Sequence, residues 1–230
     1  MRRVLVVCGA RARVLRHYAE HRLADMKVAI SSSPNECSTN FDVCITYEEL
    51  NDGKTFRRLI SDGACHLDVI WSPALKIDGP FVSSSEQEDL ELVNVNVNLL
   101  IRSMKSLVKV CMTDNTATFI FLSSIQVTQP SAGATLYGAS KAFGETLFRS
   151  LGVEYGRFGL RFNVLRLGLL QSGMARDLGP AARANIVGST PQTEAGSEKD
   201  VYSALDFLFD TDFCNLAILP LDGGAGSRGF

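Results

Sequence analysis

Short apolar runs alternate with longer amphipathic segments along nearly all of the 230-residue chain. This alternation is typical of β–α–β units, in which helices cover the faces of a parallel sheet. It predicts an α/β fold with a doubly wound parallel sheet of about seven strands and helices on both faces. Because 46% of the residues are hydrophobic, the chain can bury a large core, and we expect one domain over residues 1–230.

The apolar runs and the segments between them give the order of the elements. Strands are predicted at Val4–Cys8, Lys27–Ser31, Phe41–Ile45, Leu67–Trp71, Thr116–Leu122, Leu160–Leu167 and Leu216–Leu221. Helices are predicted at Arg11–Met26, Glu48–Ser61, Ser85–Met112, Thr135–Tyr155 and Ser197–Asp210. Residues 170–197 are rich in glycine and alanine without clear periodicity, so we expect them to form a substrate loop or lid.

Charge and cysteine content exclude several classes of partner. The formal net charge is -2 and no long basic run occurs, so we expect a small molecule as partner, and neither nucleic acid nor a membrane.

The six cysteines lack Cys-x-x-Cys spacing and are expected to be reduced. No group of His, Cys and carboxylates has metal-ligand spacing, so no metal site is expected. The first apolar run stops at Gly9, too short for a signal peptide or membrane span, and we expect a cytoplasmic protein.

A phenol, an ammonium and a hydroxyl are spaced so that one carbonyl group could meet all three. Tyr137 and Lys141 are neighbours on one face of a predicted helix, and Ser124 ends the apolar run upstream. A nearby positive charge stabilises phenolate, so we expect Lys141 to lower the pKa of Tyr137 and the phenol to face an open cleft. Such a tyrosine can act as a general acid or base near neutral pH. The alternative is ordinary: a half-buried aromatic, a solvated lysine and a turn-forming serine.

These residues and their order resemble the short-chain dehydrogenase/reductase family, in its classical single-domain form, over nearly the whole chain. Phe119–Ser124 looks like that family's fifth strand with its catalytic serine, and Tyr137 with Lys141 matches the family's active-site signature. Asn96 lies where the family has its structural asparagine, and it keeps the family's spacing to Ser124 better than the neighbouring asparagines do. A polar stripe on a helix is the alternative explanation of these asparagines.

The C-terminal third carries the resemblance further. Arg161–Val164 followed by Gly168 and Ser172 is similar to the family's sixth strand and the Pro-Gly loop beyond it, although Leu167 replaces the proline. Leu221–Gly224 looks like the family's C-terminal strand end. The resemblance implies a Rossmann-like fold, an NAD(P)-dependent oxidoreductase that interconverts a carbonyl and a hydroxyl, and a homo-oligomer, either a dimer or a tetramer.

The glycine-rich turn for the cofactor departs from the family pattern. A dinucleotide-binding turn needs glycine at three positions: for the tight turn, for backbone approach to the pyrophosphate, and for close packing of helix and strand. Gly9 keeps the first, whereas Arg13 and Leu15 occupy the second and third. A Cβ at Arg13 would crowd a pyrophosphate, and Leu15 should push the helix away from the sheet. Ser72–Leu75 stands where the family usually has Asn-Asn-Ala-Gly.

Three interpretations therefore stay open. In the first, the pocket binds a dinucleotide in shifted form, through amide groups at a helix N-terminus and the charges of Arg11 and Arg13. The second strand ends at Ser31 without an acidic residue for a ribose 2′-hydroxyl, which favours NADP over NAD. The other cofactor positions that the resemblance implies are Ser72, Ala74, Lys141, Gly168 and Ser172.

In the second interpretation, nicotinamide binding is lost and the Ser/Tyr/Lys group does acid/base chemistry alone, as in an isomerase, cyclase or dehydratase. In the third, the chain is a noncatalytic partner subunit. In the leading interpretation, Ser124 and Tyr137 act on the substrate, Lys141 also binds the nicotinamide ribose, and Asn96 holds a water that links Lys141 to solvent, as the family resemblance implies.

Overall fold

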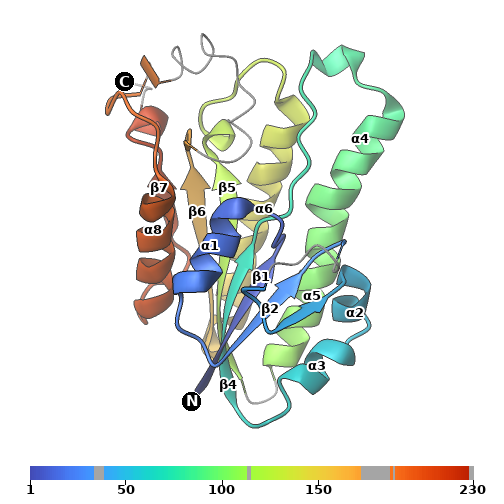
Figure 1. The fold of residues 1–230 in the computed structure, drawn as a ribbon. Coiled ribbons are helices and arrows are strands. Elements are labelled where there is room, and N and C mark those ends of the chain that lie inside the picture. Colours follow the sequence, from blue (N-terminus) through green and yellow to red (C-terminus); the bar gives the residue numbers. More distant parts are fainter. Residues whose placement is uncertain (34–38, 113–114, 172–186, 189, 228–230) are drawn as a thin grey trace.

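Seven strands form one sheet in the computed structural model, which describes residues 1–33, 39–112, 115–171, 187–188 and 190–227. The strand order is β3-β2-β1-β4-β5-β6-β7, and every neighbouring pair is parallel (Figure 1). The strands are β1 (Arg2–Cys8), β2 (Met26–Ile30), β3 (Val43–Ile45), β4 (Cys65–Trp71), β5 (Thr116–Ser124), β6 (Leu160–Leu167) and β7 (Ile218–Leu221). This order is the doubly wound arrangement, so the predicted fold class is confirmed.

Helices cover both faces of the sheet (Figure 1). On one face lie α2 (Tyr47–Asn51), α3 (Thr55–Leu59), α5 (Leu99–Cys111) and α6 (Thr135–Tyr155), and on the other α1 (Arg13–His21) and α8 (Glu198–Asp210). The helix predicted from Ser85 consists of α4 (Glu86–Val93), a π-helical segment η3 (Asn94–Asn98) and α5. Short 3-10 segments are η2 (Phe81–Ser83), η4 (Ile125–Val127), η5 (Gly156–Phe158) and η7 (Ala225–Ser227). None of the described helices is both long enough and apolar enough to cross a membrane.

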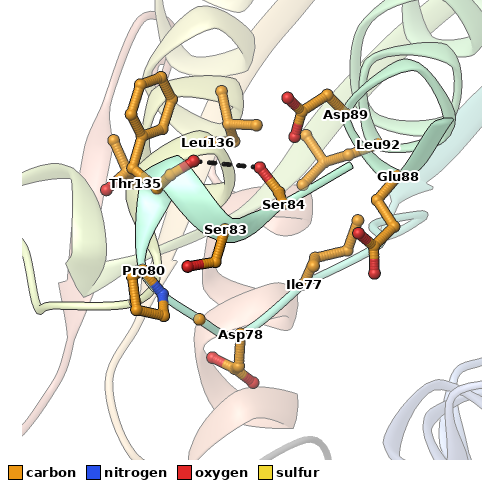
Figure 2. Close-up of a pocket in the computed structure, with 13 residues that line it drawn as sticks. Ile77, Asp78, Pro80, Ser83, Ser84, Glu88, Asp89, Leu92, Thr135 and Leu136 are labelled. Carbon is orange, nitrogen blue, oxygen red and sulfur yellow. Dashed lines mark hydrogen bonds between the residues drawn. The ribbon is translucent and has the colours of Figure 1, made fainter. Parts of the chain in front are cut away.

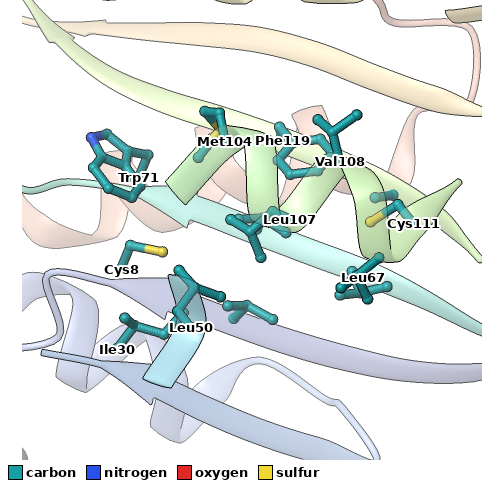
Figure 3. Close-up of a cluster of buried hydrophobic side chains, with 14 of the residues drawn as sticks. Cys8, Ile30, Leu50, Leu67, Trp71, Met104, Leu107, Val108, Cys111 and Phe119 are labelled. Carbon is teal, nitrogen blue, oxygen red and sulfur yellow. The ribbon is translucent and has the colours of Figure 1, made fainter. Parts of the chain in front are cut away.

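Alternating side chains of the strands enter two separate clusters, one on each face of the sheet. In the larger cluster, Leu107 and Met104 of α5 pack with Leu67 and Trp71 of β4 (Figure 3). Parallel strands that are buried on both faces must be apolar along their whole length, which is why they read as continuous apolar runs in the sequence.

Three local predictions were wrong. The helix predicted over Glu48–Ser61 is two short helices, because Gly53 adopts φ +70° and breaks it. The helix predicted to reach Met26 ends at His21, and the next residue, Arg22, is extended with its buried guanidinium bound to carboxylates of β4 and α8. Cys44 is disulfide-bonded, contrary to the expectation that all cysteines are reduced.

Gly144 allows α6 to approach β5 closely, and its replacement tests that contact. A Cβ added there would lie 2.2 Å from a carbon of the Phe121 ring, which is itself 2% exposed. We expect Gly144→Ala to lower the free energy of unfolding, because overpacking costs about 1–3 kcal/mol and exceeds the gain in helix propensity of about 1 kcal/mol. Urea denaturation measures the change, with Ser150→Ala on the exposed face of α6 as control, expected within about 0.5 kcal/mol of the parent. A urea midpoint for Gly144→Ala at or above that of the parent would contradict this packing.

Candidate active site

The predicted catalytic side chains meet at the carboxyl edge of the sheet, on β5 and the first turns of α6. Ser124 is the last residue of β5, and Tyr137 and Lys141 lie on α6. The backbone of α6 contacts β5 and β6 along its length, which fixes these side chains against the strand ends. The three residues that the sequence grouped are therefore neighbours in the fold.

Tyr137 is covered and hydrogen-bonded to Ser124. Tyr137 is only 5% exposed, so its phenol does not face an open cleft as we had expected. Burial raises the pKa of Tyr137, and the hydrogen bond with Ser124 offsets this only in part. The expected lowering of this pKa is therefore wrong, and the phenol stays protonated at neutral pH. A protonated phenol can donate a proton but cannot accept one.

Lys141 points to the strand rather than to the phenol oxygen. Its Nζ donates a hydrogen bond of 2.7 Å to the carbonyl oxygen of Leu122 and lies 4.9 Å from the centre of the Phe121 ring. The same Nζ is 5.7 Å from the centre of the Tyr137 ring, so the ammonium faces the aromatic ring. Burial lowers the pKa of Lys141 to about 7, although the carboxylate of Glu145 acts in the opposite direction.

A buried carboxylate that the sequence analysis missed completes this part of the site. Glu145 is 4% exposed and lies one helical turn beyond Lys141 on α6. It accepts a hydrogen bond of 2.6 Å from Ser123, and Arg166 of β6 binds both of its oxygens. The signal in the sequence was a glutamate at the i+4 position from Lys141, on the face of the helix that the Tyr/Lys pair already placed toward the sheet.

Asn96 is the buried asparagine of its run, as the spacing to Ser124 indicated. It lies in η3, is 5% exposed, and its amide binds the backbone of Leu75 twice: Oδ1 accepts from N–H at 2.7 Å, and Nδ2 donates to C=O at 2.8 Å. Nδ2 also donates to Ser140 Oγ at 2.9 Å. Asn98, by contrast, is exposed and binds Asn94. Asn96 thus fastens the loop after β4 to α6.

The turn after β1 joins the strand to α1 through a glycine in the left-handed conformation. Gly9 has φ +83°, and an added Cβ would lie 3.1 Å from the backbone nitrogen of Pro73, so this position needs glycine. No side chain caps the N-terminus of α1, where Ala12 is the N-cap residue. The free amides of such a helix end attract anions. Arg11 lies on this turn and is exposed.

The two residues that replace glycine in the turn are directed elsewhere. Arg13 binds Glu198 of α8 through Nε and Nη2, at 3.1 and 3.0 Å, so its charge is paired with a carboxylate. Leu15 is fully buried in the cluster between α1 and the sheet. The helix accommodates this leucine by packing it into the core.

The other expected cofactor residues lie around the same edge. Ser31 is 2% exposed, and its hydroxyl accepts from the amide of Ser33. Ser72 donates its N–H to the carbonyl of Cys8 at the end of β1, and Ala74 follows it half-buried. At Gly168 an added Cβ would lie 2.7 Å from Asp222 Cα, so glycine is required where β6 and β7 end. Ser172, like most of the expected lid at 170–197, lies outside the described residues.

Residues 53–226 match the family model described as enoyl-(acyl carrier protein) reductase, which belongs to the short-chain dehydrogenases/reductases. The chain belongs to the short-chain dehydrogenase/reductase family. The match covers the strands and helices that carry Asn96, Ser124, Tyr137 and Lys141.

Curated relatives resemble part of the chain. One is 3-oxoacyl-[acyl-carrier-protein] reductase FabG of Pseudomonas aeruginosa, 26% identical over 160 residues, which are 69% of this chain and 65% of that protein. Another is 7alpha-hydroxysteroid dehydrogenase of Paraclostridium sordellii, 23% identical over 151 residues, which are 64% of this chain and 57% of that protein. The chain thus spans less than two thirds of the length of these relatives.

Solved structures of short-chain dehydrogenases/reductases share the whole fold. A putative gluconate dehydrogenase from Agrobacterium tumefaciens superposes with a TM-score of 0.88 and 17% identity, over 99% of this chain and 97% of the other. A gluconate 5-dehydrogenase from Burkholderia cenocepacia, solved with NADP and tartrate, has a TM-score of 0.86 and 18% identity, over 99% and 96%. At these identities the likeness establishes the fold alone.

One cavity in this short-chain dehydrogenase/reductase lies beside the N-terminus of α6 (Figure 2). It has a volume of about 240 Å³ and lies between the 77–84 loop, α4 and the start of α6. Its wall combines apolar side chains such as Leu92 and Leu136 with the carboxylates of Asp78, Glu88 and Asp89. Ser124, Tyr137 and Lys141 are not among the described residues that line it, so it is separate from the catalytic candidates.

Removing the side-chain amide of Asn96 tests how much its two hydrogen bonds to the backbone of Leu75 contribute to stability. We expect Asn96→Ala to lower the free energy of unfolding by about 1–3 kcal/mol, because the half-buried N–H and C=O of Leu75 and the buried hydroxyl of Ser140 lose their partner. Asn98→Ala is the matched control in the same helical segment, and its expected change is within about 0.5 kcal/mol. Equal losses for both variants in urea denaturation would show that these hydrogen bonds contribute nothing to stability.

The depressed pKa of Lys141 predicts a pH-dependent stability. Between pH about 7 and about 10 the unfolded chain holds a proton that folded Lys141 has lost, so the free energy of unfolding rises with pH in that window. Below pH about 7 the full cost of burying the charge is present. Relative to Lys141→Met, the wild type should gain up to about 1.4 kcal/mol per pH unit in this range. Urea midpoints measured from pH 6 to 10 check this, with the exposed Lys105→Met as control. Parallel curves for wild type and Lys141→Met would refute the assignment.

Proposed function

We propose that the protein is an oxidoreductase that interconverts a carbonyl and a hydroxyl group on a small molecule with NADP(H). The observation that supports this most directly is the Ser124 hydroxyl bonded to the buried, protonated phenol of Tyr137, with the ammonium of Lys141 over the same ring. The names of its relatives, a 3-oxoacyl-[acyl-carrier-protein] reductase and a hydroxysteroid dehydrogenase, agree with this class of reaction.

The raised pKa of Tyr137 favours the reductive direction. Ser124 would donate a hydrogen bond to the substrate carbonyl oxygen, and Tyr137 would donate its proton to the alkoxide oxygen that develops. When bound, the reduced nicotinamide supplies the hydride that reaches the carbonyl carbon. The products would be an alcohol, the oxidised nicotinamide and a tyrosine phenolate, and the phenolate must be reprotonated before the next turnover.

Lys141 is suited to return that proton. With a pKa of about 7 it holds a proton in roughly half of the molecules at neutral pH and gives it up readily. Its Nζ lies 5.7 Å from the centre of the Tyr137 ring and is bonded to the Leu122 carbonyl, so the ammonium would turn from that carbonyl toward the phenolate, whose negative charge attracts it, before the proton is returned. We propose that Asn96 supports this arrangement through Leu75 and Ser140, the latter being bound to the backbone carbonyl of Tyr137 at 2.7 Å.

The residues at the carboxyl edge fit a dinucleotide, although they depart from the usual motif. Gly9 and the uncapped N-terminus of α1 offer backbone amides where a pyrophosphate binds in this fold, and Arg11 adds positive charge. Ser31, which directly follows β2, stands where an acidic residue would hold a ribose 2′-hydroxyl, and this favours NADP over NAD. Lys141 and Gly168 would hold the nicotinamide end.

One observation favours a second function. The side chains of Arg13 and Leu15 occupy two positions where a dinucleotide turn uses glycine, and Arg13 is already paired with Glu198. If these prevent binding of the dinucleotide, the Ser/Tyr/Lys group would act as an acid/base catalyst without a cofactor, or the chain would serve as a noncatalytic subunit.

Nucleotide titration distinguishes these functions. Purified protein is titrated with NADPH and with NADH, and the melting temperature is followed. At 100 times the dissociation constant, bound nucleotide should raise the free energy of unfolding by about 2.7 kcal/mol, or roughly 5–10 °C in melting temperature. We expect this shift at a lower concentration of NADPH than of NADH. No shift with either nucleotide would eliminate the oxidoreductase function in favour of the second one.

The catalytic role of Tyr137 is measured in the same preparation. NADPH oxidation is followed with a 3-oxoacyl thioester, and NADP⁺ reduction with gluconate, the compound classes named for the relatives. Tyr137→Phe removes the proton donor but keeps the buried ring, so turnover should fall by about 10²-fold or more while the NADPH-induced shift in melting temperature is retained. Undiminished turnover in Tyr137→Phe would exclude the mechanism.

A further inference from the structure

The proposed reaction leaves one buried charge of the site without a role. Glu145 is 4% exposed and lies on α6 one turn beyond Lys141, on the same helix face. A carboxylate buried to this degree is rare unless it is paired, because removal from water penalises its charge. Its position beside Lys141 therefore calls for an explanation beyond helix packing.

Three hydrogen bonds fix this carboxylate relative to the strand ends. Oε1 accepts from Ser123 Oγ at 2.6 Å and from Arg166 Nε at 2.9 Å, and Oε2 accepts from Arg166 Nη2 at 2.6 Å. Ser123 directly precedes the proposed catalytic Ser124 on β5, and Arg166 lies two residues before Gly168 on β6. The carboxylate thus joins α6 to the two strands whose ends form the site.

Glu145 is also the carboxylate that acts on Lys141. From α6, the titratable groups facing the ammonium are Tyr137, whose ring lies 5.7 Å away, and Glu145. From β5, Lys141 meets the carbonyl of Leu122 and the Phe121 ring, which carry no formal charge. The cation on β6, Arg166, is bound to Glu145, and its pKa is raised mainly by that hydrogen bond. Among the described residues, no other carboxylate affects Lys141.

We propose that Glu145, held by Ser123 and Arg166, is a positioning residue that keeps Lys141 protonated near neutral pH, so that Lys141 can return a proton to Tyr137 after each reduction. This inference rests on the proposed function. It adds to that function a buried relay of Ser123, Arg166 and Glu145 behind the three proposed catalytic residues.

The direction of the effect follows from the charges. Burial has already brought the pKa of Lys141 down to about 7, and the negative charge of Glu145 raises it. Glu145→Gln keeps the size of the side chain and removes the charge, so the pKa of Lys141 falls further. Because protonated Lys141 is the active form in reduction, turnover declines as pH rises through its pKa. The variant should therefore lose activity at a lower pH than the wild type.

A thermodynamic cycle tests the coupling without any assay of activity. Melting temperatures are measured for the wild type, Glu145→Gln, Lys141→Met and the double variant, at pH 6 and pH 9. At pH 6 we expect Glu145→Gln to reduce the melting temperature more in the presence of Lys141 than in the Met background. At pH 9, where Lys141 is neutral, this difference should shrink. Equal losses in both backgrounds at pH 6 would overturn the proposal, whether or not the protein is an oxidoreductase.

The pH profile of turnover tests the role in catalysis. In Glu145→Gln the falling limb of NADPH-dependent reduction should move to lower pH by about one unit or more. Glu154→Gln, which removes an exposed carboxylate from the far end of the same helix, should leave the limb in place. If the unpaired guanidinium prevents Glu145→Gln from folding, Glu145→Gln with Arg166→Gln removes both charges, and the limb should move in the same direction by a smaller amount, because loss of the nearby cation partly offsets loss of the carboxylate. If Glu145→Gln is active and the falling limb of its pH profile stays at the wild-type pH, the proposed role of Glu145 is wrong, while the proposed function is unaffected.

Discussion

The packing of α6 against β5 is the contact on which the site depends. Gly144 leaves room for the Phe121 ring, and the closeness of helix and strand brings Lys141 within hydrogen-bond distance of the Leu122 carbonyl. A larger residue at position 144 would separate the two elements. Ser124 is carried by the strand and Tyr137 by the helix, so their hydrogen bond exists only because these surfaces meet.

The same closeness sets the charges of the site. Burial disfavours phenolate on Tyr137 and ammonium on Lys141, so the two groups approach a neutral pair instead of the ion pair that their spacing suggested. Glu145 limits this effect for the lysine. A site of this kind stores a proton on the phenol and holds a second, loosely bound proton one helical turn away, which suits repeated proton donation.

Sequence patterns predicted the fold well, because parallel strands and the helices between them each have their own periodicity. They also brought Ser124, Tyr137 and Lys141 together, since order along the chain and helix spacing fix those relations. They failed where the outcome depended on surroundings: the pKa of Tyr137 follows from burial, the pairing of Arg13 from the distant Glu198, and the break at Gly53 from a single backbone angle. Glu145 escaped notice because its partners, Ser123 and Arg166, are far from it in sequence.

The π-helical segment η3, between α4 and α5, determines how this part of the chain tolerates a change in length. Leu92, Asn96 and Leu100 are all buried, although steps of four residues drift around a regular α-helix. The π-helical turn of η3 holds one more residue than a turn of α-helix, and it therefore keeps these three side chains on the buried side of the helix. Loss of a residue between positions 94 and 98 would leave a more regular helix with the apolar stripe of α5 still facing the sheet, but it would turn Asn96 away from its present direction toward Leu75. The bulge is thus a one-residue insertion that the fold now requires.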